Sequence, residues 1–315
     1  MAESDCKDDH EIFASIIILT KNGERYLHPL LDGLLAQSIA GTFEIILIDS
    51  GSKDGTLQIV ADYPAVRLYE IPPKEFGHGK TRNLGAELAH GKFLVYIPQD
   101  ATPVGRDWLE KLLRPFENPA VAGVYARQVA RADANAMEKF FLGDAYSSTP
   151  ETKSLARGEE ASLARCFFST VSGAIRVSIW ARYPFREDII MSEDQAWASE
   201  VMRAGYAVAY APDSCVLHSH QYGIADVFRR NFDSGHSIKQ IFAGKTGIPF
   251  WRVVAKLMRE AAFVLRYGTA GEWLKFLPYE AARHVGFMLG RHSESLPVSM
   301  RKKFSSLRYF WEQSS

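Results

Sequence analysis

The chain has 315 residues, with 37 Lys and Arg against 37 Asp and Glu. This length allows two domains, or one large domain with an extension, and a full hydrophobic core. The balanced charge gives no sign of a polyanionic partner, so we expect no binding to nucleic acid. The charge is unevenly distributed, because residues 251–315 hold 11 Lys and Arg against 5 Asp and Glu.

The three cysteines, Cys6, Cys166 and Cys215, are widely spaced and odd in number. This pattern favours reduced thiols over a disulfide framework or a zinc site. The first residues, MAESDCKDDHE, lack the apolar segment of a signal peptide, and no uncharged apolar run reaches 18 residues. We therefore expect a cytoplasmic protein.

Apolar runs alternate with amphipathic segments between residues 13 and 127. The predicted strands cover residues 13–20, 43–49, 66–71, 93–97 and 121–126. The predicted helices between them cover residues 24–38, 54–62, 79–90 and 105–116. Such alternation, with strands rich in Ile, Val and Leu, predicts an α/β fold with a mostly parallel, Rossmann-like sheet flanked by helices.

The rest of the chain begins with a polar, helix-prone segment, residues 128–165. After it we expect a strand at 172–180, a helix at 193–204, and short strands at 206–211 and 214–220. From residue 223 onwards the pattern is helical, and we expect Pro249 and Pro278 to break the helices. We divide the chain into three units, residues 12–127, 128–222 and a basic helical extension, 223–315.

Two stretches indicate a phosphate-containing ligand at the edge of the sheet. Asp49 ends the second predicted strand, where open α/β sheets bind ligands, and could accept a hydrogen bond from a base or a ribose. FGHGKTRNLGA, 76–86, is neither a Walker A nor a dinucleotide motif, because Lys74 and Arg82 stand where glycines are required. It still places Lys80 and Arg82 in the first turn of a helix, which favours a nearby anion such as pyrophosphate. The alternative is a surface loop with solvated charges.

Acids and histidines form the second group of candidates. Asp100, in YIPQDATP, is a lone acid at the end of a strand. Glu193 and Asp194 open a helix, where acids also offset the helix dipole. His218 and His220 alternate on one predicted strand, so both would point to the same face and could bind a metal, although buried core histidines are commoner.

Taken in order, these segments resemble family-2 glycosyltransferases of the GT-A fold, and most closely the rhamnosyltransferase-like branch that builds bacterial surface polysaccharides. The resemblance covers residues 13–240. It rests on the stretches IIILTKNG, IDSGSKDGT, FGHGKTRNLGA, YIPQDATP, SGAIR, SEDQAWASEVMRAGY and VLHSHQY.

The resemblance implies a role for each candidate in binding a nucleotide sugar. Thr20 and Asn22 would line the nucleotide pocket, and Asp49 would bind the pyrimidine base. The residues expected near the ribose and the pyrophosphate are His78, Arg82 and Asn83. Asp100 would stand where the family's Asp-x-Asp motif holds a divalent cation, Mg²⁺ or Mn²⁺, on the diphosphate.

The remaining roles concern the acceptor and the metal. Asp194 would be the general base, with Glu193 as the alternate, and one displacement with one base inverts the anomeric centre. The chain reads QDA where the family commonly has two acids, which leaves Asp100 as the sole acidic metal ligand. His218 or His220 would then complete the metal site. The QDA ending also favours dTDP-rhamnose as the donor.

The resemblance therefore implies an inverting transferase that moves a sugar to a glycan or a lipid-linked glycan in surface polysaccharide synthesis. Two alternatives stay open. One is another nucleotide-dependent enzyme, such as an oxidoreductase or a nucleotidyltransferase, although the latter should have a glycine-rich basic loop where this chain reads LTKNGERY. The other is an inactive carbohydrate-binding protein that keeps the fold.

The extension is basic and rich in aromatic residues. Helices of this composition can lie at a membrane surface, which would suit an acceptor carried on a lipid. The same residues could instead pack on the core or on a second subunit. The aromatic residues concerned are Phe250, Trp251, Phe263, Tyr267, Trp273 and Phe276.

Overall fold

The computed structural model describes residues 12–313, and at its centre is a nine-stranded sheet. The strand order is β3-β2-β1-β4-β8-β6-β9-β5, and β7 also pairs with β9. The strands are β1 (Ile12–Thr20), β2 (Thr42–Asp49), β3 (Val66–Glu70), β4 (Phe93–Pro98), β5 (Thr102–Pro103), β6 (Val121–Val129), β7 (Glu151–Lys153), β8 (Gly173–Arg176) and β9 (Ala207–Leu217).

The sheet is mostly parallel, as predicted. β1 pairs in parallel with β2 and β4, β2 with β3, and β6 with β9. β8 lies antiparallel between β4 and β6, so β4 and β6 run in the same direction. Among the described strands, only β5, β7 and β8 run antiparallel to the others. The predicted boundary at residue 127 falls within β6, and strands from both sides of it join one sheet.

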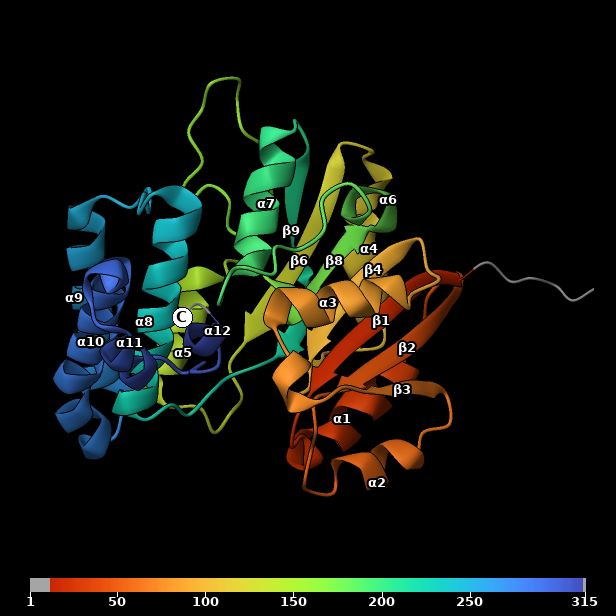
Figure 1. The fold of residues 1–315 in the computed structure, drawn as a ribbon, viewed down its shortest axis with the longest axis horizontal. Coiled ribbons are helices and arrows are strands. Elements are labelled where there is room, and N and C mark those ends of the chain that lie inside the picture. Colours follow the sequence, from red (N-terminus) through yellow and green to blue (C-terminus); the bar gives the residue numbers. More distant parts are fainter. Residues whose placement is uncertain (1–11, 314–315) are drawn as a thin grey trace, which may run out of the picture.

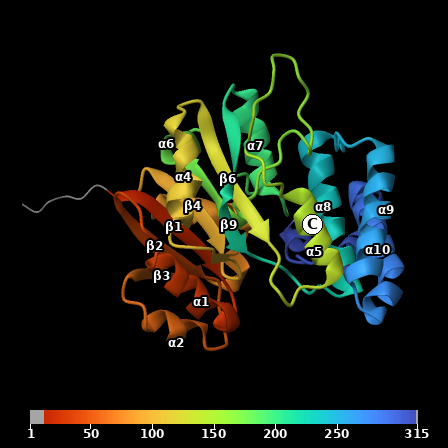
Figure 2. The same ribbon diagram turned by 180° about the vertical axis from the view of Figure 1, so that it is seen from behind.

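Helices cover both faces of this sheet (Figures 1 and 2). One face packs against α1 (Glu24–Leu35), α2 (Thr56–Ala61) and α4 (Trp108–Leu113). The other packs against α3 (His78–Glu87), α6 (Val177–Trp180) and α7 (Glu193–Arg203). Because successive side chains of a strand point to opposite faces, Ile16 and Ile18 enter the first core and Ile17 enters the second. Each buried isoleucine contributes about 1.5–3 kcal/mol.

The position of α3 depends on a close approach to the sheet. A Cβ atom at Gly85 would collide with the side chain of Ile17 on β1. Glycine therefore lets the α3 backbone lie directly on the strand. This contact brings the first turn of α3, with His78 and Arg82, to the carboxyl edge of the sheet.

The extension forms a layer of helices beside the sheet (Figure 1). α8 and α10 pack backbone to backbone, because a Cβ atom at Gly235, Gly286 or Gly290 would collide with a carbonyl group of the opposite helix. No helix within residues 12–313 has the length and apolar character needed to cross a membrane. The remaining α-helices are α5 (Ala136–Ala145), α8 (Ile224–Phe242), α9 (Phe250–Tyr267), α10 (Ala270–Arg291), α11 (Val298–Phe304) and α12 (Phe310–Gln313).

Pro249 precedes α9 as expected, but the expected break at Pro278 is wrong. Pro278 lies inside α10, which continues to Arg291. Proline removes one helical hydrogen bond and leaves the carbonyl group of Leu274 without it. Leu274 is 82% exposed, so water can satisfy that carbonyl group and the helix continues.

Three predicted strands differ from the structure. The chain from residue 172 to 180 forms β8 only as far as Arg176, and α6 follows directly. The two short strands predicted at 206–211 and 214–220 form one strand, β9. A shift in its register with β6, between Ala211 and Cys215, accommodates Pro212 and the two residues after it.

The cysteine prediction is tested in part. Cys166 and Cys215 are free thiols in the structure. Cys6 lies outside the described residues.

Candidate active site

A cavity of about 460 Å³ opens at the carboxyl ends of β1 and β4, and we call it the sheet-edge cavity. Asp100 is the second residue after β4, and His78 and Arg82 come from the start of α3. The lining of the sheet-edge cavity includes Thr20, Lys21, Ser50, Phe76, His78, Arg82, Gln99, Asp100, Thr170, Val171, His218, His220, Tyr222, Arg230 and Leu307.

Gln99 joins the ends of the two central strands. Its Oε1 accepts hydrogen bonds from the Thr20 hydroxyl at 2.5 Å and from the Lys21 amide at 2.8 Å. Its Nε2 donates to the Lys21 carbonyl at 3.1 Å. The side chain of Gln99 therefore holds the end of β1 beside the end of β4. An amide suits this position because it both accepts and donates hydrogen bonds.

Asp100, His218 and His220 converge in the sheet-edge cavity. The Asp100 carboxylate lies 3.6 Å from Nε2 of His218 and 3.5 Å from Nδ1 of His220. One ligand atom from each residue lies within 4.8 Å of the others, as a metal site requires. The expectation that both histidines occupy a strand is wrong, because β9 ends at Leu217, where its pairing with β6 also ends. Both rings nevertheless turn toward Asp100.

Gln128 fixes the ring of His218. Its Nε2 donates to Ser169 Oγ at 3.1 Å and to the Tyr146 hydroxyl, so its Oε1 faces His218. Nδ1 of His218 donates to that oxygen at 2.9 Å. The other ring nitrogen, Nε2, is then left with a lone pair directed at the site, which is the usual arrangement of a metal-binding histidine.

The charge of Asp100 also suits a cation ligand. Burial alone would raise the pKa of Asp100, but contact with His218 and the nearby His220 outweigh it and lower the pKa to about 2. Burial and the neighbouring His218 lower the pKa of His220 to about 4. The carboxylate of Asp100 and the imidazole of His220 are thus in the protonation states that bind a metal. The distances from Asp100 to the two histidines fit ligands of one ion, which lie roughly 3–4 Å apart at metal–ligand distances of about 2.1 Å.

Arg82 and Glu193 form an ion pair between α3 and α7. Their side chains are only 14% and 4% exposed. Because Glu193 is engaged by the guanidinium group of Arg82, it is poorly placed to accept a proton. Burial, with the nearby charges of Arg82 and Arg230, lowers the pKa of His78 to about 3, so His78 is neutral.

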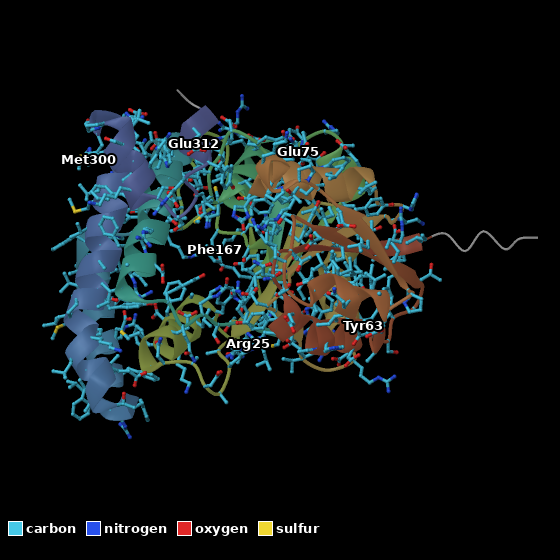
Figure 3. All side chains as sticks on the ribbon, turned by 60° about the horizontal axis from the view of Figure 1, so that its bottom comes forward. Arg25, Tyr63, Glu75, Phe167, Met300 and Glu312 are labelled. Atoms are coloured by element: carbon cyan, nitrogen blue, oxygen red, sulfur yellow. The ribbon has the colours of Figure 1, made fainter. Side chains whose placement is uncertain are left out.

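Asp194 lines a second cavity of about 360 Å³, which we call the Asp194 cavity. Its carboxylate accepts hydrogen bonds from the amides of Thr170 at 3.1 Å and Gln195 at 2.8 Å. Burial and the adjacent Glu193 raise the pKa of Asp194 to about 6. Such a carboxylate is ionised at neutral pH and takes up a proton readily. Figure 3 shows Phe167, which lines this cavity, between the helical layer and the sheet.

The two cavities share a wall, so a ligand in one would lie beside a ligand in the other. The residues that line both are Val171, His218, His220, Tyr222 and Arg230.

Asp49 and Asn22 lie at the same sheet edge but do not line the described cavities. Asp49 is fully buried, and its carboxylate accepts hydrogen bonds from the amides of Gly51 at 2.8 Å and Ser52 at 2.9 Å. Asn22 accepts a hydrogen bond from the Lys53 amide at 2.8 Å. Both side chains shape the turn after β2, and their contact with a nucleotide stays a prediction.

Asn83 uses its amide group within the protein. Its Nδ2 donates to the Phe185 carbonyl at 2.8 Å and to Glu187 at 3.0 Å. Its Oδ1 accepts from Trp180 and from the Phe185 amide, each at 3.0 Å. These contacts indicate that Asn83 anchors the loop before α7, and its place near the ribose stays a prediction.

Sequence reasoning missed several residues of the site. Tyr222 stacks on His220 with ring centroids 4.5 Å apart, and Arg230 lies 4.8 Å from the centre of the Tyr222 ring. Arg131 donates to the Asp100 carbonyl at 2.7 Å. The run HSHQY could have indicated Tyr222, two residues after His220, whereas nothing in the sequence indicates Leu307, which lies 207 residues after Asp100.

Comparison with known proteins gives consistent results. The family model described as Glycosyl transferase family 2 matches residues 15–170. The chain is 33% identical to the O-antigen chain rhamnosyltransferase RfbN of Salmonella typhimurium, over 94% of this chain and 95% of the relative. It is 32% identical to the O-antigen chain rhamnosyltransferase WbaN of Salmonella anatum, over 85% and 86%.

Solved structures agree on the fold. The mannosyltransferase PcManGT from Pyrobaculum calidifontis, in complex with GDP-Man and Mn²⁺, superposes with a TM-score of 0.58 at 18% identity, over 89% of this chain and 86% of that chain. The predicted GT-A fold is therefore confirmed. With relatives above 30% identity along nearly its whole length, the chain is a glycosyltransferase and belongs to glycosyl transferase family 2.

Proposed function

We propose that this enzyme transfers rhamnose from dTDP-rhamnose, with inversion, to a glycan or a lipid-linked glycan in the synthesis of a surface polysaccharide. The relatives that match along nearly the whole chain are named as O-antigen chain rhamnosyltransferases. The observation that carries the proposal is the shared wall between the sheet-edge cavity, where Asp100, His218 and His220 converge, and the cavity lined by the buried carboxylate of Asp194.

In the sheet-edge cavity the donor would lie with its diphosphate near Asp100. Asp100, His218 and His220 would hold a divalent cation, which neutralises charge on the leaving diphosphate. Two imidazoles in the ligand set favour Mn²⁺ over Mg²⁺, which prefers oxygen ligands. Thr20 would contact the nucleotide directly, whereas the turn shaped by Asn22 and Asp49 brings Ser50 to the cavity.

The start of α3 supplies the remaining donor contacts. His78 is neutral and can donate one hydrogen bond to a phosphate oxygen. Arg82 lines the cavity while paired with Glu193, so its charge is held in place without rearrangement. Asn83 would support these contacts from behind, through the loop that it anchors.

Asp194 would act on the acceptor. Its carboxylate takes the proton of the acceptor hydroxyl group as the oxygen attacks the anomeric carbon. The bond from that carbon to the diphosphate oxygen breaks, and the nucleoside diphosphate leaves with the electron pair. Attack opposite to the leaving group inverts the anomeric centre.

The donor assignment is tested by incubating the purified enzyme and Mn²⁺ with a panel of sugar nucleotides. Glycan fragments from the surface polysaccharide of the organism that makes the enzyme serve as acceptors. We expect product to form fastest with dTDP-rhamnose and NMR to show an inverted anomeric centre. Faster transfer from another sugar nucleotide, or retention of configuration, would contradict the proposal.

The helical layer would rest on a membrane surface through one side of α9 and α10. With 3.6 residues per turn, most exposed apolar residues fall on one side of each helix, and Tyr267 lies on the other side of α9. Arg252 and Arg266 are exposed elsewhere on α9, where they add to the positive charge of the extension, which attracts anionic lipid. These apolar residues are Phe250, Trp251, Val254, Met258 and Leu265 on α9, and Leu274, Leu277, Val285 and Met288 on α10.

Vesicle flotation tests this surface. We expect the enzyme to float with phosphatidylglycerol vesicles, and Leu274→Glu with Leu277→Glu to reduce the floating fraction severalfold. The matched control is Val104→Glu, at a site that is also exposed but lies near β5. Equal flotation of the double variant and the control would refute the membrane contact and favour a subunit interface, which sedimentation would detect.

A further inference from the structure

A third cavity lies outside the two described above, between the loop that follows β6 and the turn that joins α9 to α10. Its volume is about 950 Å³, and we call it the outer cleft. The segments that form it are far apart in the sequence. Its lining includes Asp133, Asn135, Lys139, Gln221, Tyr222, Phe263, Tyr267, Glu272, Lys275 and Tyr279.

The outer cleft adjoins the active site. Tyr279 lines both the outer cleft and the Asp194 cavity. Tyr222 lines these two and also the sheet-edge cavity, where it stacks on His220. A ligand that reaches from Asp194 past these two tyrosines therefore enters the outer cleft.

The lining of the cleft suits sugar rings. Tyr267 is 62% exposed and stacks at an angle on Phe263, with centroids 4.7 Å apart, which presents an aromatic surface. The C–H faces of a pyranose are apolar and pack on such rings, while its hydroxyl groups bond to polar groups around them. Asp133 and Lys275 have no ion-pair partner within residues 12–313, so both can bond to a ligand.

The charges of the cleft argue against an anionic ligand. Two lysines, Lys139 and Lys275, are balanced by Asp133 and Glu272. A diphosphate or a lipid headgroup would meet as much negative as positive charge. The balance favours a neutral ligand with many hydroxyl groups.

We infer that the outer cleft binds the sugar units of the acceptor that precede the sugar receiving the transferred residue. This inference rests on the proposed function and specifies its acceptor as an oligosaccharide. The terminal sugar occupies the Asp194 cavity, and the chain passes Tyr279 and Tyr222 so that the next units stack on Tyr267. On α9 and α10 the cleft residues lie on the side opposite the exposed apolar residues, so glycan and membrane would not compete.

The test compares a monosaccharide and a trisaccharide acceptor with the same terminal sugar, both prepared by partial hydrolysis of the host's surface polysaccharide. We expect the trisaccharide to have the lower KM. Tyr267→Ala should raise the KM for the trisaccharide about 3- to 10-fold, the loss of one stacking contact, and leave its kcat unchanged. The KM for the monosaccharide should not change, and Tyr267→Phe should behave like the wild type.

Leu265→Ala is the matched control, because Leu265 is 63% exposed on the other side of α9. It should leave both KM values unchanged. Equal KM values of the wild type for the two acceptors, or an unchanged trisaccharide KM in Tyr267→Ala, would overturn the inference.

Binding of the trisaccharide without donor, followed by ligand-observed NMR, separates this inference from the proposed function. Weaker binding to Tyr267→Ala than to Leu265→Ala would support acceptor binding in the outer cleft even if dTDP-rhamnose is not the donor. Equal binding to the two variants would contradict acceptor binding in the outer cleft, whatever the donor is.

Discussion

Asp100 and Asp194 are carboxylates on opposite sides of one wall, and their surroundings push their pKa values apart. Two histidines beside Asp100 lower its pKa to about 2, although burial acts in the other direction. Burial and a neighbouring acid raise the pKa of Asp194 to about 6. We expect a pair of carboxylates separated in this way to divide its roles. Asp100 is a permanent anion suited to a cation, and Asp194 is an exchangeable proton acceptor.

The two cavities also differ in how they are built. The sheet-edge cavity draws on strand ends and the first turn of α3, which the central sheet holds in place. The Asp194 cavity draws on the start of α7, the loop before β8 and side chains of the helical layer. The proposed donor cavity is thus fixed by the sheet, whereas the proposed acceptor cavity depends on how the helices pack. That dependence would suit a site that differs among enzymes with different acceptors.

The largest expected effect comes from Asp194→Asn. We expect it to lower kcat by about 10³-fold or more, because the acceptor proton has no other base, and to leave nucleotide affinity near normal. Calorimetric titration with dTDP checks the affinity, and transfer at the wild-type rate would refute the assignment. The variant should also melt at a higher temperature than the wild type at pH 8. Ionised Asp194 destabilises the fold above its pKa, and the difference should vanish near pH 4, where Asp194 is protonated.

Asp100→Ala should weaken donor binding about 100-fold in Mn²⁺, because it removes the only carboxylate of the cluster. Chelation of the metal should weaken donor binding by the wild type to the same level, and it should not weaken donor binding by the variant further. Asp226→Ala serves as the control, since Asp226 is an exposed acid at the start of α8. Equal donor affinity with and without the cation in the wild type would contradict the metal site.

The pH dependence sharpens the contrast between the two acids. Asp194 must be ionised to accept a proton, so kcat should fall tenfold per pH unit below about pH 6. Asp100 and His220 should keep their protonation states over the same range, because the pKa of Asp100 is about 2 and that of His220 is about 4, so neither should weaken donor binding. A parallel loss of donor affinity between pH 6 and pH 5 would show that the two cavities titrate together.

The smallest effect is expected from Gln128→Met, which removes the acceptor for Nδ1 of His218. The Mn²⁺ concentration for half-maximal activity should rise about 10-fold, with kcat at saturating metal nearly unchanged. Gln128→Glu keeps an acceptor and should stay close to the wild type. A fall in kcat at saturating metal for Gln128→Met would mean that Gln128 acts on the acceptor side instead.

The sequence predicts the donor side better than the acceptor side. Asp100, His78 and Arg82 could be placed because each stands at the end of a strand or the start of a helix, where local pattern determines position. The meeting of Asp100 with His218 and His220 was expected from the resemblance. The strand geometry given as its reason was wrong, since both histidines lie beyond β9.

Other parts of the site depend on tertiary contacts that local pattern does not encode. Gln99 and Asn83 are polar residues in the stretches that suggested a ligand site, but their side chains form hydrogen bonds within the protein. Pro278 was read as a helix break because the exposure of its turn cannot be seen in the sequence. Leu307 reaches the sheet-edge cavity only because the end of the helical layer folds back against α8.

That fold-back has a consequence for how the enzyme matures. Asp233, buried in α8, accepts a hydrogen bond from the amide of Ser306 at 2.8 Å, and this contact holds Leu307 at the sheet-edge cavity. Tyr309 packs against Phe76, just before α3. During translation the sheet can form long before these residues leave the ribosome, but the wall of its cavity cannot. A nascent chain would therefore carry a folded sheet with an unfinished cavity wall until residue 309 has left the ribosome.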